Sequence, residues 1–168
     1  MPLPEIVRLL VAVALTAVLA IAAVNDVRVR KIPNWTVLAA MALFIPWAVV
    51  HPLPWDGWAL AAAVIAFAVS FGLYSAGLVG AGDSKLFTAV ALFGGLGDLP
   101  MLAFATALVG GLIALASLLL RPTRALVMAK LRGKGDFGPG VPYGVAIAAA
   151  AALVVWGAVL VPGSAVFS

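Results

Sequence analysis

Two aspartates in this sequence, Asp26 and Asp83, combine a residue type and a position that suit acid–base chemistry. Each follows a long apolar run. A carboxylate held near hydrocarbon is costly, so an acid in such a position tends to be paired or functional. Two carboxylates that share a site do not both ionise easily, and one keeps a proton near neutral pH. The ionised partner can then take a proton from water while the protonated one donates to a carbonyl oxygen, which is the chemistry of amide hydrolysis.

The remaining candidate groups suit such chemistry less well. Asp136 lies in a glycine-rich stretch that offers no fixed geometry, and His51 stands alone in a proline-rich loop without a second ligand nearby. The chain has no cysteine, which excludes a disulfide framework and a thiolate metal site. We therefore predict that the protein uses neither a metal nor another cofactor.

Each aspartate also has a purely structural interpretation. Asp83 could cap the helix that follows it, and Asp26 could be a solvated residue balanced by the arginines beyond it. Two glycines, Gly80 and Gly82, precede Asp83. They favour a functional interpretation, because a bare backbone lets another chain approach closely and a helix cap has no need of that clearance.

The elements that position these acids are apolar segments. The 168-residue chain is 65% hydrophobic and 10% charged, with a mean hydropathy of +1.23, which is far too apolar for a soluble domain. At about 20 residues per crossing, this predicts an all-α, polytopic membrane protein of about six transmembrane helices, in a single membrane-embedded domain over residues 1–168. The predicted spans are 6–24, 35–50, 57–79, 86–96, 101–120 and 141–161. The fourth is short, so Asp83 is expected to lie deeper than an ordinary loop residue.

The basic residues predict the orientation of these spans. Alternation places the loops 25–34, 80–85 and 121–140 on one side, and they hold nine of the ten Lys and Arg residues, all except Arg8. By the positive-inside rule these loops are cytoplasmic and both termini are external. Asp26 and Asp83 then share the cytoplasmic side. The computed pI of about 10.0 reflects this orientation and the lipid headgroups that basic loops contact, and predicts no nucleic-acid partner.

Two sequence motifs resemble those of the aspartic prepilin peptidases, the type IV leader peptidase family. The first is Asp26-x5-Ile32-Pro33-Asn34, and the second is Gly80-Ala81-Gly82-Asp83-Ser84-Lys85. Pro142-Tyr143-Gly144 at the start of the last span also resembles the family, and the likeness covers nearly the whole chain. Gly-x-Gly-Asp alone is shared with presenilin-like proteases. The two motifs together, on one side of a six-span chain, are specific.

The resemblance implies an endopeptidase of the bacterial inner membrane that cuts the basic leader from prepilins or pseudopilins, just before their hydrophobic helix, at the cytoplasmic face. Asp26 and Asp83 are the catalytic pair in this interpretation, and Gly80 and Gly82 shape the approach to Asp83. Lys85 either biases the pair electrostatically or anchors its helix at the headgroups. The supporting residues that the resemblance implies are Pro33, Asn34, Pro142, Tyr143 and Gly144.

The chain departs from the long members of this family, which carry a four-cysteine zinc segment and also methylate the new pilin N-terminus. With no cysteine and a short first loop, it resembles the short, peptidase-only form of Flp or tight-adherence pilus systems. Two alternatives remain open on the residues alone. One is a proton-coupled transporter, although such proteins place their sites near the midplane and show duplicated halves. The other is a non-catalytic scaffold for pilus assembly.

Overall fold

The computed structural model describes residues 2–50, 58–120 and 142–160, and this part of the chain is entirely helical apart from short connections. Its five helices are α1 (Leu3–Val29), α2 (Asn34–Val50), α3 (Trp58–Ser75), α4 (Ala81–Leu120) and α6 (Tyr143–Leu160). His51, Asp136 and the basic stretch 121–140 lie outside the described residues.

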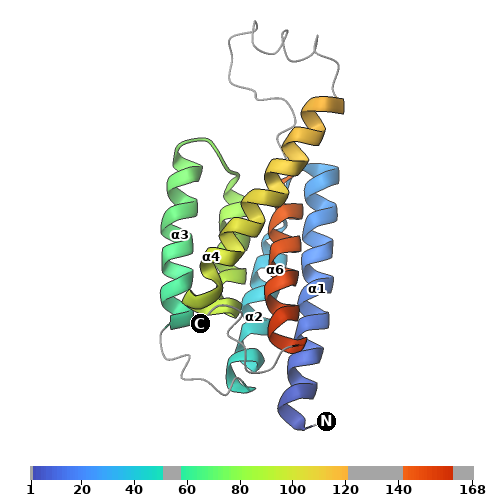
Figure 1. Cartoon of the computed structure of the whole chain (residues 1–168), viewed down its shortest axis with the longest axis vertical. Helices are drawn as coiled ribbons and strands as arrows, with labels where there is room; N and C mark the ends of the chain where they lie inside the picture. The colour runs from blue at the N-terminus through green and yellow to red at the C-terminus, as the bar shows by residue number, and fades with distance from the viewer. Residues whose placement is uncertain (1, 51–57, 121–141, 161–168) are drawn as a thin grey trace, which may run out of the picture.

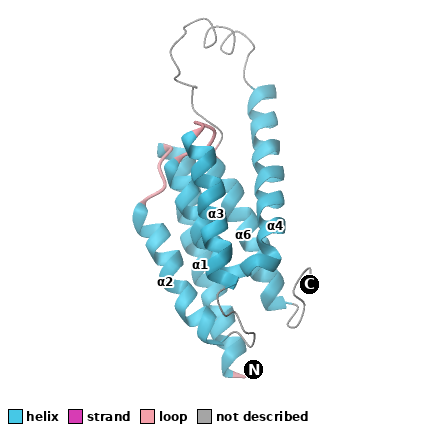
Figure 2. Cartoon of the chain, turned by 90° about the vertical axis from the view of Figure 1, so that its left-hand side faces the viewer, coloured by secondary structure: helices cyan, strands magenta, loops and turns pink. Residues whose placement is uncertain are grey.

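The helices form a bundle with alternating directions (Figures 1 and 2). α1 rises from the N-terminus, α2 descends, α3 rises again and α6 descends toward the C-terminus. α4 is two helices joined at Gly95, whose backbone is left-handed with φ 60°. The part before Gly95 descends beside α3, and the part after it rises to the upper end of the bundle (Figure 1).

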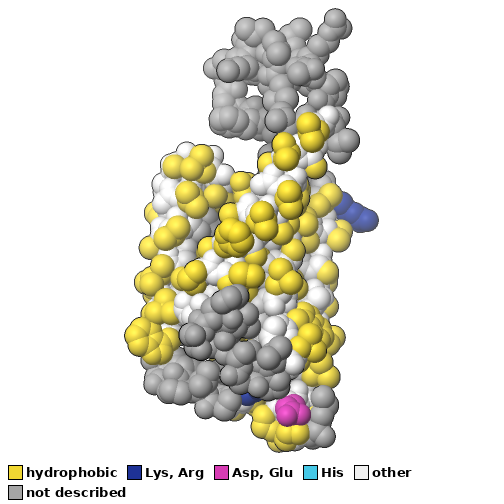
Figure 3. Space-filling view, viewed as in Figure 1, with side chains coloured by type: hydrophobic (Ala, Val, Ile, Leu, Met, Phe, Trp, Pro, Cys, Tyr) yellow, Lys and Arg dark blue, Asp and Glu magenta, His cyan; other side chains and the backbone are white. Residues whose placement is uncertain are grey.

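The structure confirms a multi-pass, all-α membrane protein. Among the described residues, four helices are long and apolar enough to cross a membrane, namely α1, α3, α4 and α6, and α2 is a shorter apolar helix. Their outward surfaces carry large hydrophobic side chains such as Leu38, Val64 and Leu112, each more than half exposed. Figure 3 shows this apolar surface on one face, with few charged side chains among the described residues. Exposed apolar surface on every side of a helix is stable in lipid and unfavourable in water.

The predicted boundaries were wrong at three places. Asp26 was expected in a loop but belongs to the last turn of α1, which ends at a left-handed Arg30 with φ 56°. The run predicted to reach Val79 ends as a helix at Ser75, because Gly77 has a left-handed backbone (φ 73°) and the amides of Gly77 and Leu78 close a Schellman cap on α3. The turn expected at 97–100 is helical, and the break falls at Gly95 instead.

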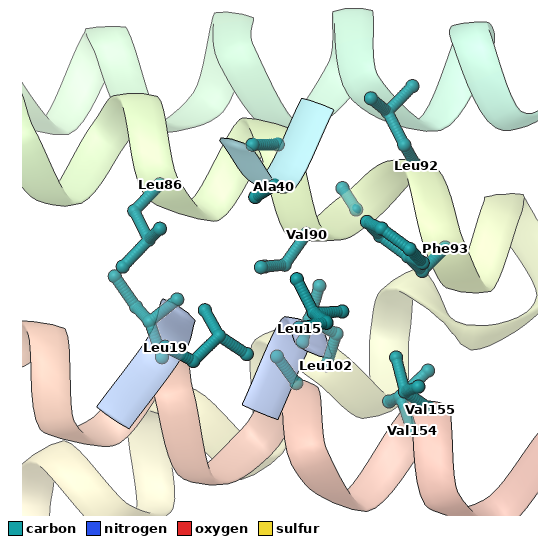
Figure 4. Packing of buried hydrophobic residues seen from close by; sticks show 14 of the residues in the cluster. Leu15, Leu19, Ala40, Leu86, Val90, Leu92, Phe93, Leu102, Val154 and Val155 are labelled. Carbon is teal, nitrogen blue, oxygen red and sulfur yellow. The ribbon is translucent and has the colours of Figure 1, made fainter. Parts of the chain in front are cut away.

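The interior of the bundle is packed with small and branched side chains. Leu15 and Leu19 of α1 meet Leu86 and Val90 of α4 and Val155 of α6 within one cluster (Figure 4). Many other buried positions are alanines that are almost fully inaccessible: Ala12, Ala22, Ala40, Ala62, Ala66, Ala146, Ala150 and Ala151. Small residues let helix backbones approach closely in a bilayer, where packing takes the place of the hydrophobic effect as the force between helices.

Polar and aromatic contacts fix how the helices pair. Trp156 of α6 donates its indole N–H to the Thr16 hydroxyl of α1 at 3.1 Å. Phe93 of α4 packs against Phe44 and Trp47 of α2, with ring centroids 5.7 and 5.8 Å apart. Within the described residues α2 packs on α1 and α4, whereas α3 packs on α4 alone and its backbone stays more than 8 Å from that of α2. α4 therefore separates α2 from α3.

Candidate active site

Asp26 is held by the start of a helix that is distant in sequence. Its side chain is 7% exposed, and its Oδ2 accepts a hydrogen bond of 2.8 Å from the backbone N–H of Gly144. Gly144 lies in the first turn of α6, where amides have no partner within the helix and the helix dipole favours a negative charge. A Cβ on Gly144 would stand 2.9 Å from Asp26 Oδ2 and 3.0 Å from its Cβ, so only glycine fits this contact.

Asp83 lies in the first turn of α4, and its own helix start orients it. Its Oδ2 accepts a hydrogen bond of 3.2 Å from the N–H of Gly80, the residue that precedes the helix. This is the second half of a capping box, in which an acid at the third helical position bonds back to the capping residue. Asp83 thus has a structural role at its helix start, but its side chain also reaches a cavity.

Asp26 and Asp83 line the same cavity of about 300 Å³ at the upper end of the bundle as drawn in Figure 1, where α1 ends and α2 and α4 begin. The backbones of α1 and α4 stay more than 8 Å apart throughout the described residues. The two acids therefore line the cavity from two separate helices, α1 and α4.

The other walls come from the two motifs that the sequence singled out. The cavity is also lined by Arg30, Lys31, Ile32, Asn34, Gly80, Ala81, Gly82 and Lys85. Gly82 packs on Ile32 so closely that a Cβ there would lie 3.1 Å from the Ile32 Cβ. The second glycine of the motif therefore lets the connection after α1 lie directly against the start of α4. The first glycine supplies the N–H for Asp83.

Lys85 and the start of α2 are joined across the cavity rim. The Lys85 ammonium donates to Asn34 Oδ1 at 3.4 Å, and both side chains are exposed. Pro33 supports the same turn, because its carbonyl accepts bonds from the Thr36 N–H at 3.1 Å and from the Thr36 hydroxyl at 2.7 Å. Lys85 lines the same cavity as the two acids, and its hydrogen bond to Asn34 leaves the ammonium open to solvent.

The residues of the third motif, Pro142-Tyr143-Gly144, make contacts at two different places in the bundle. Gly144 contacts Asp26, as described. The Tyr143 ring lies instead against α4, since a Cβ on Gly110 would come 2.9 Å from the ring, and Tyr143 does not line the acid cavity. Pro142 starts the helix, its carbonyl accepting the Val145 N–H at 3.2 Å.

Sequence reasoning did not identify every residue of the cavity. It missed Arg30, Lys31, Ile32 and Ala81 as lining residues, although their places within the two motifs were a signal that could have found them. Gly144 was included as a supporting residue, but its contact with Asp26 was not expected. Within the described ranges, no three His, Cys, Asp or Glu side chains gather as metal ligands.

Fold and site together define a multi-pass membrane protein with a pair of buried or half-buried aspartates in one cavity at the end of its helix bundle. Comparison with known families matches residues 13–115 to the type IV leader peptidase family, and the chain belongs to that family. The matched residues include both aspartates and both motifs around them, while Pro142-Tyr143-Gly144 lies beyond the match. Neither the curated proteins nor the solved structures yield a match to this chain.

Family membership implies cleavage of prepilin leaders by an aspartic-type peptidase, with prepilins as substrates and the inner membrane as location. This agrees with the apolar helices of the structure.

Proposed function

We propose that Asp26 and Asp83 are the catalytic pair of this prepilin peptidase. The observation that carries the proposal is their shared cavity, reached from two helices whose acids are far apart in the sequence. A structural cap would not need a second acid in the same space. Each carboxylate keeps one oxygen engaged by a backbone N–H, from Gly144 or from Gly80, which leaves its other oxygen available for water or substrate.

The reaction follows from this arrangement. The ionised carboxyl takes a proton from a water held between the acids, and the resulting hydroxide attacks the carbonyl carbon of the scissile bond. The protonated carboxyl donates its proton to the carbonyl oxygen, giving a neutral tetrahedral intermediate. Collapse of that intermediate breaks the C–N bond: the proton taken from water passes to the leaving amine, and one hydroxyl proton of the intermediate returns to the carboxylate that had protonated the carbonyl oxygen. Leader acid and mature N-terminal amine are the products.

We also propose that the chain crosses the membrane six times, with the acid cavity at the cytoplasmic face and the opposite end of the bundle external. The support is the distribution of basic residues, of which only Arg8 lies outside the three loops on the acids' side. Arg8 is partly buried and donates to the Val50 carbonyl at the end of α2 at 3.1 Å, so it has a structural use where it stands. The absence of cysteine from the sequence supports the short, peptidase-only form.

The test is co-expression with candidate prepilins, following loss of the leader by a shift in size. Asp26→Asn and Asp83→Asn are each expected to abolish cleavage while the protein still inserts and accumulates. The double variant should be barely worse than either single one, because members of a catalytic unit do not contribute additively.

Two other acids provide controls. Asp98→Asn changes an acid on the same helix as Asp83 that does not line the cavity, and Asp136→Asn changes one in the glycine-rich stretch. Both variants are expected to keep most activity. Loss of cleavage in either control at equal protein level, or retention of cleavage in Asp26→Asn or Asp83→Asn, would show that the pair is wrong.

A further inference from the structure

A second, apolar cavity of about 480 Å³ lies between α2 and α3, with α4 as its floor. It exists because α2 and α3 both pack on α4 without packing on each other in the described part of the chain. The upper and lower limits of its three walls are Val37 and Phe44 on α2, Phe67 and Leu60 on α3, and Lys85 and Leu92 on α4.

This second cavity is a groove that opens to the side of the bundle and is not a closed void. Met41, Leu60 and Phe67, which line it, are 48%, 58% and 49% exposed. Each of its three walls covers about two helical turns, or about 10 Å at 1.5 Å per residue. The groove is therefore a side opening of the bundle, and its length matches about two turns of a helix that would lie along it.

The groove begins where the acid cavity ends. Lys85 lines both spaces. Because α2 and the first part of α4 descend while α3 rises (Figure 1), the uppermost lining residues of the three walls are Val37 on α2, Phe67 on α3 and Lys85 on α4. From these residues the groove runs away from the acids, into the apolar part of the bundle. A chain with its scissile bond between Asp26 and Asp83 could continue past Lys85 into it.

We propose that this groove receives the first two turns of the apolar helix that follows the cut bond of the prepilin. The inference rests on the proposed function, which requires a substrate cut at the border between a polar leader and an apolar segment. Such a segment must be helical inside lipid, because its backbone groups find no other partners there. A groove with two apolar walls, a floor containing Ala89 and one end at the acid cavity fits that segment. A lipid chain would need no connection to the acids.

Cross-linking tests the position of the substrate directly, since the chain has no cysteine of its own. Met41→Cys and Ala63→Cys place a thiol in the groove. Ala42→Cys and Ile65→Cys are matched controls at similar depth on the same helices, at exposed positions that do not line it. Each variant is combined with Asp83→Asn, so that the substrate stays uncut, and with a prepilin carrying one cysteine one to two turns after the cut site.

Disulfides are expected from Met41→Cys and Ala63→Cys and not from the two controls. Equal cross-linking from the groove variants and the control variants, or cross-linking from the controls alone, would overturn the groove as the docking site. Cleavage by the chain with wild-type Asp83 in the same membranes is measured alongside. If prepilin is cut normally while the groove cysteines stay unlinked, the groove inference fails and the peptidase assignment stands. If no prepilin is cut, the proposed function itself fails.

A second variant fills the groove. Ala63→Phe should lower kcat/KM for full-length prepilin about tenfold, corresponding to about 1.4 kcal/mol of lost binding, while Ile65→Phe should stay within about twofold of wild type. A short peptide that spans the cut bond but lacks the apolar helix should be cut equally by Ala63→Phe and wild type. Unchanged cleavage of full-length prepilin by Ala63→Phe, the result expected if only lipid fills the groove, would contradict the proposal.

Discussion

Replacing Gly144 by alanine should disable Asp26 without touching an acid. The added Cβ would lie 2.9 Å from Asp26 Oδ2, 3.0 Å from its Cβ and 3.1 Å from its Cγ, so the whole side chain must move. The movement breaks the 2.8 Å hydrogen bond from the Gly144 N–H. A hydrogen bond to a charged group contributes about 1.5–3 kcal/mol. If that contribution is lost in the transition state, leader cleavage falls roughly 10- to 150-fold, since about 1.4 kcal/mol corresponds to tenfold in rate.

The assay is the initial rate of prepilin cleavage by purified protein in detergent, with thermal unfolding measured on the same samples. Gly111→Ala is the matched control, because a Cβ there meets nothing within 4 Å, and it should cleave at the wild-type rate. A Gly144→Ala protein that unfolds like wild type and retains more than half of the activity would refute the reasoning. It would mean that the Gly144 N–H does not hold Asp26 in its working position.

Three further predictions concern the membrane, the helix contact beside Asp83 and the product. Reporter fusions after Gly135 should read cytoplasmic, and fusions after Pro54 or at the C-terminus external; a cytoplasmic signal from the C-terminus would contradict the six-span proposal. Ser84→Ala should lower the free energy of unfolding by about 0.5–1.7 kcal/mol, since the buried Ser84 hydroxyl donates to the Ser70 carbonyl of α3 at 3.0 Å; exposed Ser75→Ala, measured by the same thermal unfolding, should not. Pilin processed by this enzyme alone should carry a free α-amino terminus, and an added methyl group seen by mass spectrometry would overturn the peptidase-only proposal.

Much of the helical architecture could be predicted because lipid leaves the backbone few choices. An apolar run must satisfy its own hydrogen bonds, so most of the described part of each predicted run lies on a helix of the structure. The helix ends were harder to predict, because hydropathy reports where hydrocarbon ends and not where hydrogen bonding ends. Asp26 is polar but still helical. Pro100 is typical of a turn in sequence, yet it lies about one turn into the helix after Gly95, near positions that proline tolerates.

The two acids were identified from their local motifs, since both motifs surround them in sequence. The residue that fixes Asp26 was not, because Gly144 is far along the chain and nothing in local spacing indicates which helix start will meet which acid. The roles of Gly80 and Gly82 were partly predicted. Close approach was expected for both. The structure shows it at both positions: Gly82 packs on Ile32, and a Cβ on Gly80 would lie 2.9 Å from Asp83 Oδ2, the atom that the Gly80 N–H bonds. The two acids that share the cavity were therefore easier to find from sequence than the residues that hold them.

Because the backbones of α1 and α4 stay more than 8 Å apart in the described residues, the spacing of the two acids depends on the side chains between these helices and on the helices that pack against both. α2 and α6 each pack on both α1 and α4, so they act as spacers whose thickness determines the width of the acid cavity. On α6 that thickness depends on alanines, and Ala146 and Ala150 are fully inaccessible. Each methylene added at such a position in a close-packed interior must push the helices apart. The distance between the carboxyl groups is therefore expected to be adjustable from positions deep in the bilayer, with no change at the site itself.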